Sequence, residues 1–162
     1  MSFLSWRDDY LVGVTQIDME HQYLFGLINQ FHDRYRSGGE RKDVLAVLSS
    51  LVAYAEEHFQ HEEALMARIG YPQLAPHHEQ HEKLFCYIFE LFQKLEKGAL
   101  SGEAEMLLFL RKWLLEHILQ TDMDIGRFLN RRPHGNSDAG EKPPENPAEK
   151  APSTPEPAEA VH

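Results

Sequence analysis

A histidine and a glutamate at helical spacing stand inside one apolar segment of the chain. His58 and Glu62 are four residues apart in the run H-F-Q-H-E-E, so on an α-helix their side chains stack on one face. A buried imidazole and a buried carboxylate are costly unless other groups satisfy them. The spacing therefore predicts a polar partner or a metal ion. Apolar residues recur around the same face: Leu48, Leu51, Val52, Ala55, Phe59, Leu65, Met66 and Ile69.

Further polar residues interrupt the apolar stripes of the other predicted helices. Taken alone, any one of these histidines is more often a core residue hydrogen-bonded to a carbonyl. Together they are hard to satisfy, because neutral imidazole has one donor and one acceptor while a carboxylate only accepts. Metal ions resolve both problems, since imidazole and carboxylate become ligands. The candidate metal ligands are His21, His58, Glu62, His77, His81, His117 and Asp122.

The number of ligands indicates two metal ions. Seven protein ligands exceed one tetrahedral or octahedral site once solvent is included. If Glu62 and Asp122 bridge two ions together with a bridging oxygen, each ion receives three shared oxygens, and five histidines divide three to two. One ion is then closed and the other keeps a vacant position. A redox-active pair with one vacancy, enclosed by leucine and isoleucine, suits a small apolar diatomic ligand.

Four predicted helices position these residues. We expect the first to begin at Asp18 as its N-cap and to end at Ser37-Gly38-Gly39. The second covers about 42–69, before Gly70-Tyr71-Pro72, the third opens near Pro76 and stops at Gly98, and the fourth begins between 101 and 103. Short links make sequential helices antiparallel, which predicts an all-α, up-down-up-down four-helix bundle.

The two ends of the chain differ from this central part. Residues 1 to about 16 lack a helical period and are predicted to form an arm packed through Trp6, Tyr10, Leu11 and Val14. Residues 132–162 hold seven of the nine prolines and no aromatic residue, so we expect a disordered tail rich in Pro, Glu and Ala. The predicted domains are a bundle over 1–131 and this tail. The tail is interpreted as a solvated spacer, with a partner-binding segment as the alternative.

Composition limits the function classes. A net charge of −10 disfavours a nucleic-acid partner. Cys86, the only cysteine, lies between Leu84, Phe85 and Ile88 and is predicted to be a buried structural thiol. The first residues do not resemble a signal peptide, and no apolar run reaches the ~20 residues of a membrane span. These features predict a cytoplasmic protein. Helix exteriors rich in Glu, Lys, Arg and Gln predict a monomer.

Some details of the histidine pattern stay open. Asp122 follows His117 by five residues, so on an ideal helix its side chain is rotated about 140° from that of His117. Either the helix widens locally, as in a π-bulge, or the two side chains converge from opposite flanks. His61 and His78 are rotated off the apolar stripe and are expected to be solvated, whereas His32 is expected to be partly buried.

The motifs resemble those of hemerythrin, specifically of the single-domain bacterial hemerythrins. The resemblance covers about 5–131 and includes I-D-M-E-H, H-F-x-x-E, H-x-x-x-H and H-x-x-x-x-D. It implies a non-haem di-iron centre (Fe2+/Fe3+, with a bridging oxo or hydroxo group) that binds O2 reversibly at the iron with two histidines. It also implies that His77, His81 and His117 hold one iron, that His21 and His58 hold the other, and that Glu62 and Asp122 bridge.

These features favour O2 binding, as a carrier, store or delivery protein, over catalysis. Oxygen-activating bundle sites typically carry Glu-x-x-His pairs, and no glutamate stands three residues before any of the five candidate ligand histidines here. The apolar neighbours of His21 and His58 offer no obvious proton donor. The alternatives are a di-iron enzyme acting on O2, peroxide or nitric oxide, and an O2 or redox sensor module. A zinc-only site is disfavoured by the seven ligands. A protein partner for the tail, or for O2 delivery, stays open.

Overall fold

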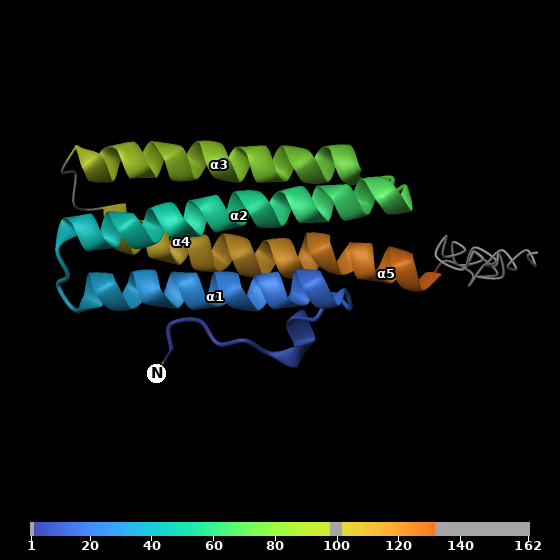
Figure 1. Ribbon diagram of the computed structural model, residues 1–162, viewed down its shortest axis with the longest axis horizontal. Helices are drawn as coiled ribbons and strands as arrows, with labels where there is room; N and C mark the ends of the chain where they lie inside the picture. The colour runs from blue at the N-terminus through green and yellow to red at the C-terminus, as the bar shows by residue number, and fades with distance from the viewer. Residues whose placement is uncertain (1, 98–101, 132–162) are drawn as a thin grey trace, which may run out of the picture. The chain divides into compact units, whose positions relative to one another are not determined.

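The fold is a bundle of four antiparallel helical columns, as the computed structural model shows (Figure 1). The structure describes residues 2–97 and 102–131. The columns are α1 (Thr15–Arg36), α2 (Arg41–Ile69), α3 (Leu74–Glu96) and a fourth in which α4 (Gly102–His117) continues through a π-helical turn (Ile118–Asp122) into α5 (Met123–Arg131). The predicted all-α bundle is confirmed. The predicted disorder of 132–162 concerns residues outside the described part.

The first helix begins earlier than its N-cap prediction. α1 starts at Thr15 with Val14 in the N-cap position, so Asp18 lies inside the first turn, and the N-cap assignment was wrong. The Asp18 carboxylate instead accepts hydrogen bonds from the backbone N–H groups of Val12 (2.6 Å) and Gly13 (3.1 Å). The residue therefore ties the N-terminal arm to the helix, and its charge lies at the favourable end of the helix dipole.

The second helix ends where its glycine predicts. Gly70 adopts a left-handed conformation with φ 62°, and the N–H groups of Gly70 and Tyr71 donate to the carbonyls of Ala67 and Met66. These bonds satisfy carbonyls that the helix leaves unpaired. α3 then begins at Leu74, two residues before Pro76, so this proline lies in the first turn as expected.

The inward faces of the columns form an apolar core. Leu48, Phe31 and Met106 are fully buried in it. On α3 the core positions are Leu84 and Ile88, four residues apart, whereas Cys86 lies two residues from each, on the opposite side of the helix. Cys86 is exposed, so its predicted burial was wrong.

The N-terminal arm packs along the bundle. Leu4 and Val12 are its buried side chains, and Trp6 and Tyr10 contact Phe25 edge-on or tilted, with ring centroids 5.1 and 5.7 Å away. The predicted packing of Trp6 and Tyr10 is therefore confirmed. The predicted packing of Leu11 was wrong, because that side chain is 43% exposed.

The arm passes very close to the last helix. A Cβ atom added at Gly126 would lie 1.9 Å from the carbonyl oxygen of Val12, so only glycine fits at this crossing. The arm is thus pinned at Asp18 and at Gly126, beside the end of the bundle that carries the polar cluster.

Candidate metal centre

A buried polar cluster occupies the bundle interior, and the structure brings all seven predicted ligands together in it. Each helical column contributes at least one side chain, and no member is more than 4% exposed. Three come from α1 and α2, two from α3, and two from α4 and the π-helical turn. They are His21, His58, Glu62, His77, His81, His117 and Asp122.

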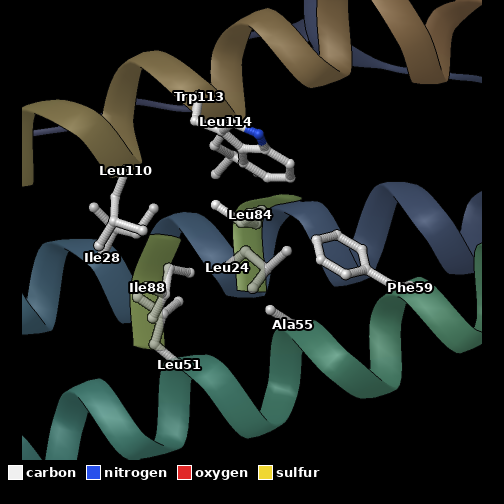
Figure 2. A pocket seen from close by; sticks show the side chains of 10 residues that line it. All are labelled: Leu24, Ile28, Leu51, Ala55, Phe59, Leu84, Ile88, Leu110, Trp113 and Leu114. Carbon is white, nitrogen blue, oxygen red and sulfur yellow. The ribbon is translucent and has the colours of Figure 1, made fainter. Parts of the chain in front are cut away.

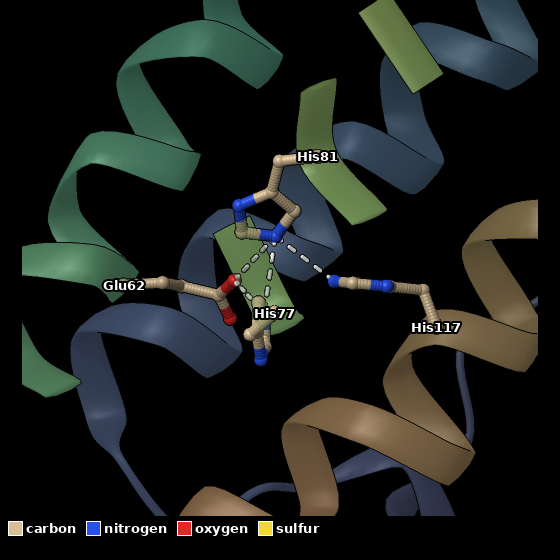
Figure 3. A group of neighbouring side chains, drawn as sticks. All are labelled: Glu62, His77, His81 and His117. Carbon is tan, nitrogen blue, oxygen red and sulfur yellow. Dashed lines mark hydrogen bonds and ion pairs between the residues drawn. The ribbon is translucent and has the colours of Figure 1, made fainter. Parts of the chain in front are cut away.

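Three of these histidines form a tight set, here called the three-histidine group (Figure 3). The Nε2 atom of His81 lies 3.0 Å from Nε2 of His77 and 3.0 Å from Nε2 of His117. The Oε2 atom of Glu62 lies 3.4 Å from both His77 Nε2 and His81 Nε2. The three rings thus present Nε2 atoms to one point that a carboxylate oxygen also faces.

The other two histidines form the two-histidine group. His21 and His58 have ring centroids 4.7 Å apart, and the Nε2 atom of each lies 3.7 Å from Oε1 of Glu62. Glu62 therefore turns one oxygen toward each group.

Asp122 divides its oxygens in the same way. Its Oδ2 lies 3.3 Å from Nε2 of His21, in the two-histidine group. Its Oδ1 lies 3.1 Å from Nε2 of His117 and 3.4 Å from Nε2 of His77, in the three-histidine group. Glu62 and Asp122 therefore each face both histidine groups.

The π-helical turn explains how Asp122 reaches the cluster. Residues Ile118–Asp122 have π geometry, which places more residues in each turn than an α-helix does. The five-residue step from His117 to Asp122 therefore returns to nearly the same face. Of the two explanations that the spacing allowed, local widening of the helix is the one observed.

The cluster as it stands contains polar atoms that no hydrogen bond satisfies. Both carboxylate oxygens of Glu62 and both of Asp122 are buried without a hydrogen-bond partner, and within the described residues neither carboxylate pairs with a lysine or arginine. Buried carboxylates of this kind require a cation. Two sets of atoms could each hold one: Glu62 with the three-histidine group, and Glu62 with the two-histidine group.

The spacing of the nitrogen atoms also fits a metal ion. Two imidazole nitrogens at right angles around a metal, each bonded at about 2.1 Å, lie about 3.0 Å apart. That is the separation of His81 Nε2 from both of its neighbours. Without a metal one Nε2 atom cannot satisfy both contacts, because it carries either one proton or one lone pair.

Protonation of the cluster follows from the same charges. Burial lowers the pKa of His21, but Asp122 and Glu62 outweigh that effect and raise the pKa to about 9. Burial raises the pKa of Glu62, yet His58, His21, His77 and His81 hold it well below the usual range. Without metal, therefore, protons on histidine partly replace the cation, and metal binding must release them.

Two glutamates hydrogen-bond to histidines of the cluster, and the sequence pattern did not single them out. Glu20 accepts a hydrogen bond from Nδ1 of His58 (2.9 Å), and Glu63 accepts one from Nδ1 of His81 (2.9 Å). A neutral ring that donates from Nδ1 keeps its lone pair on Nε2, the atom that faces the cluster. The available signal was sequence position, since each glutamate directly precedes or follows a predicted ligand.

The same glutamates also bind the two outer histidines. His61 donates to Glu20 over 2.7 Å, and its side chain is 39% exposed, so it contacts solvent as expected but is also bound to Glu20. His78 donates to Glu63 over 2.9 Å and lies at the surface, as expected. His32 is partly buried and stacks on Phe3, also as expected.

Aromatic and aliphatic side chains enclose the cluster on its inner side. Phe59 stacks on His81 with ring centroids 3.7 Å apart, and Trp113 stacks on His117 at 4.5 Å. Beyond them lies a small apolar cavity of about 20 Å³ (Figure 2). Its walls carry no charged side chain, so this side of the cluster is dry. The cavity is lined by Leu24, Ile28, Leu51, Ala55, Phe59, Leu84, Ile88, Leu110, Trp113 and Leu114.

Comparison with known proteins identifies the family. The model of the hemerythrin HHE cation binding domain matches residues 12–129. The chain belongs to the hemerythrin family. A bacteriohemerythrin from Methylococcus capsulatus is 29% identical over 131 residues, covering 80% of this chain and 99% of that protein. One from Pseudomonas aeruginosa is 33% identical over 122 residues, covering 75% and 78%.

A solved structure of wild-type hemerythrin agrees with this fold. It superposes with a TM-score of 0.72 at 28% identity, over 78% of this chain and 97% of the other. Proteins of the hemerythrin family bind a di-iron centre, and this chain has a buried histidine and carboxylate cluster that could hold metal. No helix in the described part of this hemerythrin-family chain is long and apolar enough to cross a membrane.

Proposed function

We propose that this protein binds O2 reversibly at a non-haem di-iron centre, as a carrier, store or delivery protein. In this proposal His77, His81 and His117 hold one iron, and His21 and His58 hold the other. Glu62 and Asp122 bridge the two. Family membership supports iron as the metal.

One observation carries the proposal: two buried carboxylates that no hydrogen bond satisfies divide their oxygens between histidine groups of unequal size. Glu62 and Asp122 each face both groups, which supports a pair of ions rather than two separate sites. Because one group has three histidines and the other two, the ion in the two-histidine group has one protein ligand fewer. The O2 position is therefore assigned to the side of His21 and His58.

When bound, the irons supply the electrons and the open coordination position that O2 binding requires. The chain supplies the surroundings. Glu20 holds the proton of His58 on Nδ1, and Glu63 does the same for His81, so that both Nε2 atoms are free to bind metal. Glu62 and Asp122 would each contribute an oxygen to both ions and would offset part of their positive charge.

Apolar walls favour release of O2 over its reduction. Phe59, whose ring centroid lies 5.5 Å from that of His58, and the leucines around the inner cavity exclude water, and none carries an acidic proton. Reduction of O2 consumes protons, so a wall without donors disfavours it. This is the physical ground for proposing a binding protein rather than an enzyme.

The test uses the full chain loaded with ferrous iron under anaerobic conditions. Adding O2 should produce near-ultraviolet and visible charge-transfer bands that bleach when O2 is removed by argon and return when it is restored. Stopped-flow absorbance then gives the association and dissociation rates, and slow autoxidation is expected. His58→Ala should abolish the bands, whereas His32→Ala, at a histidine that contacts Asp33 and Phe3 and no residue of the cluster, should leave them unchanged.

Two results would overturn the proposal. Metal analysis that finds zinc and no iron in protein purified from iron-supplied cells would remove the redox chemistry. Sustained O2 consumption in the presence of a reductant, with no reversible band, would instead identify an enzyme.

A further inference from the structure

An apolar groove runs along the outer face between α2 and α3, away from the bundle core. It encloses about 570 Å³ and is lined by Val52, Phe85, Phe89 and Phe92 together with the exposed Cys86. Phe89 projects into solvent, with 63% of its surface exposed. Large exposed aromatic side chains beside a groove are typical of interaction surfaces.

The groove continues directly into an acidic hollow. A neighbouring depression of about 390 Å³ shares Val52, Glu56 and Phe85 with the groove and adds Glu63, Glu82 and His78. The floor of the hollow includes Phe59 and the metal-facing His81. The outer α2–α3 face is therefore apolar at one end and acidic at the other, and the acidic end lies over the candidate metal centre.

Two carboxylates of this hollow, those of Glu56 and Glu82, lack cationic partners among the described residues. No lysine or arginine is among the described residues that line either depression. Glu56 and Glu82 form no salt bridge with the described residues, although Lys83, beside Glu82 in sequence, pairs with Glu79. Unpaired carboxylates beside an apolar groove are complementary to a ligand that is both apolar and cationic.

Charge decides between the available occupants. Residues 132–162 contain three basic and six acidic residues, so the tail carries about −3 and residues 1–131 keep about −7 of the total of −10. Both the tail and a second copy of the chain would bring further negative charge to the hollow. A basic partner gains energy where these two lose it.

The dimensions favour a short helix as that partner. His78 and Phe92 mark the two ends of the surface on α3, and fourteen residues of helix span about 21 Å, or roughly four turns. A helix laid in such a groove places one apolar face against Val52, Phe85 and Phe89 and directs charged side chains to the rim.

We propose that the outer α2–α3 face docks a basic amphipathic helix of another protein. Its apolar face fills the phenylalanine-lined groove, and its lysines or arginines pair with Glu56 and Glu82. Because the hollow includes Glu63 and His81, the bound helix would end directly over the three-histidine group. The inference does not depend on which metal the centre holds or on whether it binds O2.

The probe is a fluorescein-labelled synthetic peptide of about 16 residues, or roughly four turns. It carries leucine and phenylalanine at i, i+3, i+4 and i+7, and lysines at one end. Fluorescence anisotropy with the full chain should show one-to-one binding that weakens as salt is added. A peptide with glutamate in place of every lysine should not bind.

Matched substitutions locate the binding surface. Phe89→Ser should weaken binding about tenfold, whereas Leu108→Ser, at a position that is 61% exposed on α4, should leave it unchanged. The double substitution Glu56→Lys with Glu82→Lys should weaken it about as much. Glu57→Lys with Glu105→Lys makes the same change in net charge outside the groove and should have little effect. Circular dichroism verifies that every variant is folded.

Several outcomes overturn the proposal. Equal losses in the groove variants and their controls would mean nonspecific attraction to an acidic protein, as would equal binding of the glutamate peptide. Dimerisation in sedimentation that Phe89→Ser abolishes would identify a second copy as the occupant. Displacement of the probe by a synthetic peptide of residues 133–162 would identify the tail.

Discussion

The two histidine groups differ in how the protein surrounds them. The three-histidine group packs its Nε2 atoms 3.0 Å apart, and surface depressions reach two of its members, His81 and His77. The two-histidine group has its contacts to Glu62 at 3.7 Å, and His21 and His58 are 0% and 1% exposed. The half of the centre with the larger ligand set is therefore nearer to solvent, and the half with fewer ligands is enclosed.

This difference suits a site that must admit a small apolar molecule and exclude water. A position left open on a solvent-facing ion would be filled by water. Placing the smaller histidine group on the enclosed side leaves that position to a ligand that can pass through an apolar interior. The predictions below test this asymmetry, beginning with the substitution that should remove both halves.

Glu62→Ala should have the largest effect, because this residue faces both groups. We expect iron content to fall close to zero and the loaded protein to lose about 3–5 kcal/mol of stability, the cost of removing one partner from a buried ion pair. Iron analysis and denaturant unfolding measure the two effects. Glu57→Ala, on the exposed side of the same helix, is the control. Unchanged iron content in Glu62→Ala would contradict the bridging role.

Single histidine substitutions should separate the halves. His58→Ala removes one of two histidines and should leave about half of the iron, held by the three-histidine group, while the O2-dependent bands disappear. His81→Ala removes the nitrogen that lies 3.0 Å from both neighbours and should leave less iron than His58→Ala. Equal iron loss in both variants would mean that the two groups bind metal only as one unit.

The sequence predicted the buried residues of the cluster but not the glutamates that hydrogen-bond to them. Burial of His58 and Glu62 followed from helical periodicity, because a polar residue on an apolar stripe is visible as an interruption. Glu20 and Glu63 carry no such signal, since each occupies a position beside the stripe where glutamate is ordinary. Their roles depend on contacts between helices, across 38 residues for Glu20 and His58 and 18 for Glu63 and His81.

Local exceptions to regular helix geometry were similarly hard to predict. The His117 to Asp122 spacing allowed two explanations, and only the structure shows the π-helical turn. Cys86 was expected to be buried from its apolar neighbours, although a helix exposes one side even of an apolar run. At Asp18 a typical capping residue serves the preceding arm, whose backbone N–H groups compete for its carboxylate.

Stability of the metal-free protein should depend on pH through the enclosed half. The pKa of His21 rises from 6.5 to about 9 in the folded state, so its stabilising contribution is complete below pH 6.5 and is lost as pH rises through about 9. The loss amounts to at most about 3 kcal/mol. The pKa values of Glu62 and Asp122 are lowered, so their contribution is lost only in acid, below about pH 4.

Denaturant unfolding at pH 6 and pH 9 checks this expectation. Metal-free protein should be less stable at the higher pH, whereas metal-loaded protein should not, because a metal ion displaces the proton from His21. His21→Ala should remove most of the pH dependence in the metal-free state. A metal-free protein whose stability is equal at both pH values would show that no proton is held between His21 and the carboxylates.

The smallest expected effect concerns the glutamates that orient one histidine in each half. Glu20→Ala and Glu63→Ala should each weaken metal binding about 10–100-fold, because the ring of His58 or of His81 loses the acceptor that fixes its tautomer. Glu20→Gln and Glu63→Gln should recover most of the affinity, since the amide oxygen still accepts a hydrogen bond.

Competition with a metal chelator measures these affinities, and the two glutamates should differ in what else changes. Glu20 supports the enclosed half, so Glu20→Ala should also speed O2 dissociation and autoxidation, whereas Glu63→Ala should alter affinity for metal with little effect on O2 rates. If both substitutions change the O2 rates equally, the two halves act as one site, and the assignment of O2 to the side of His21 and His58 loses its support.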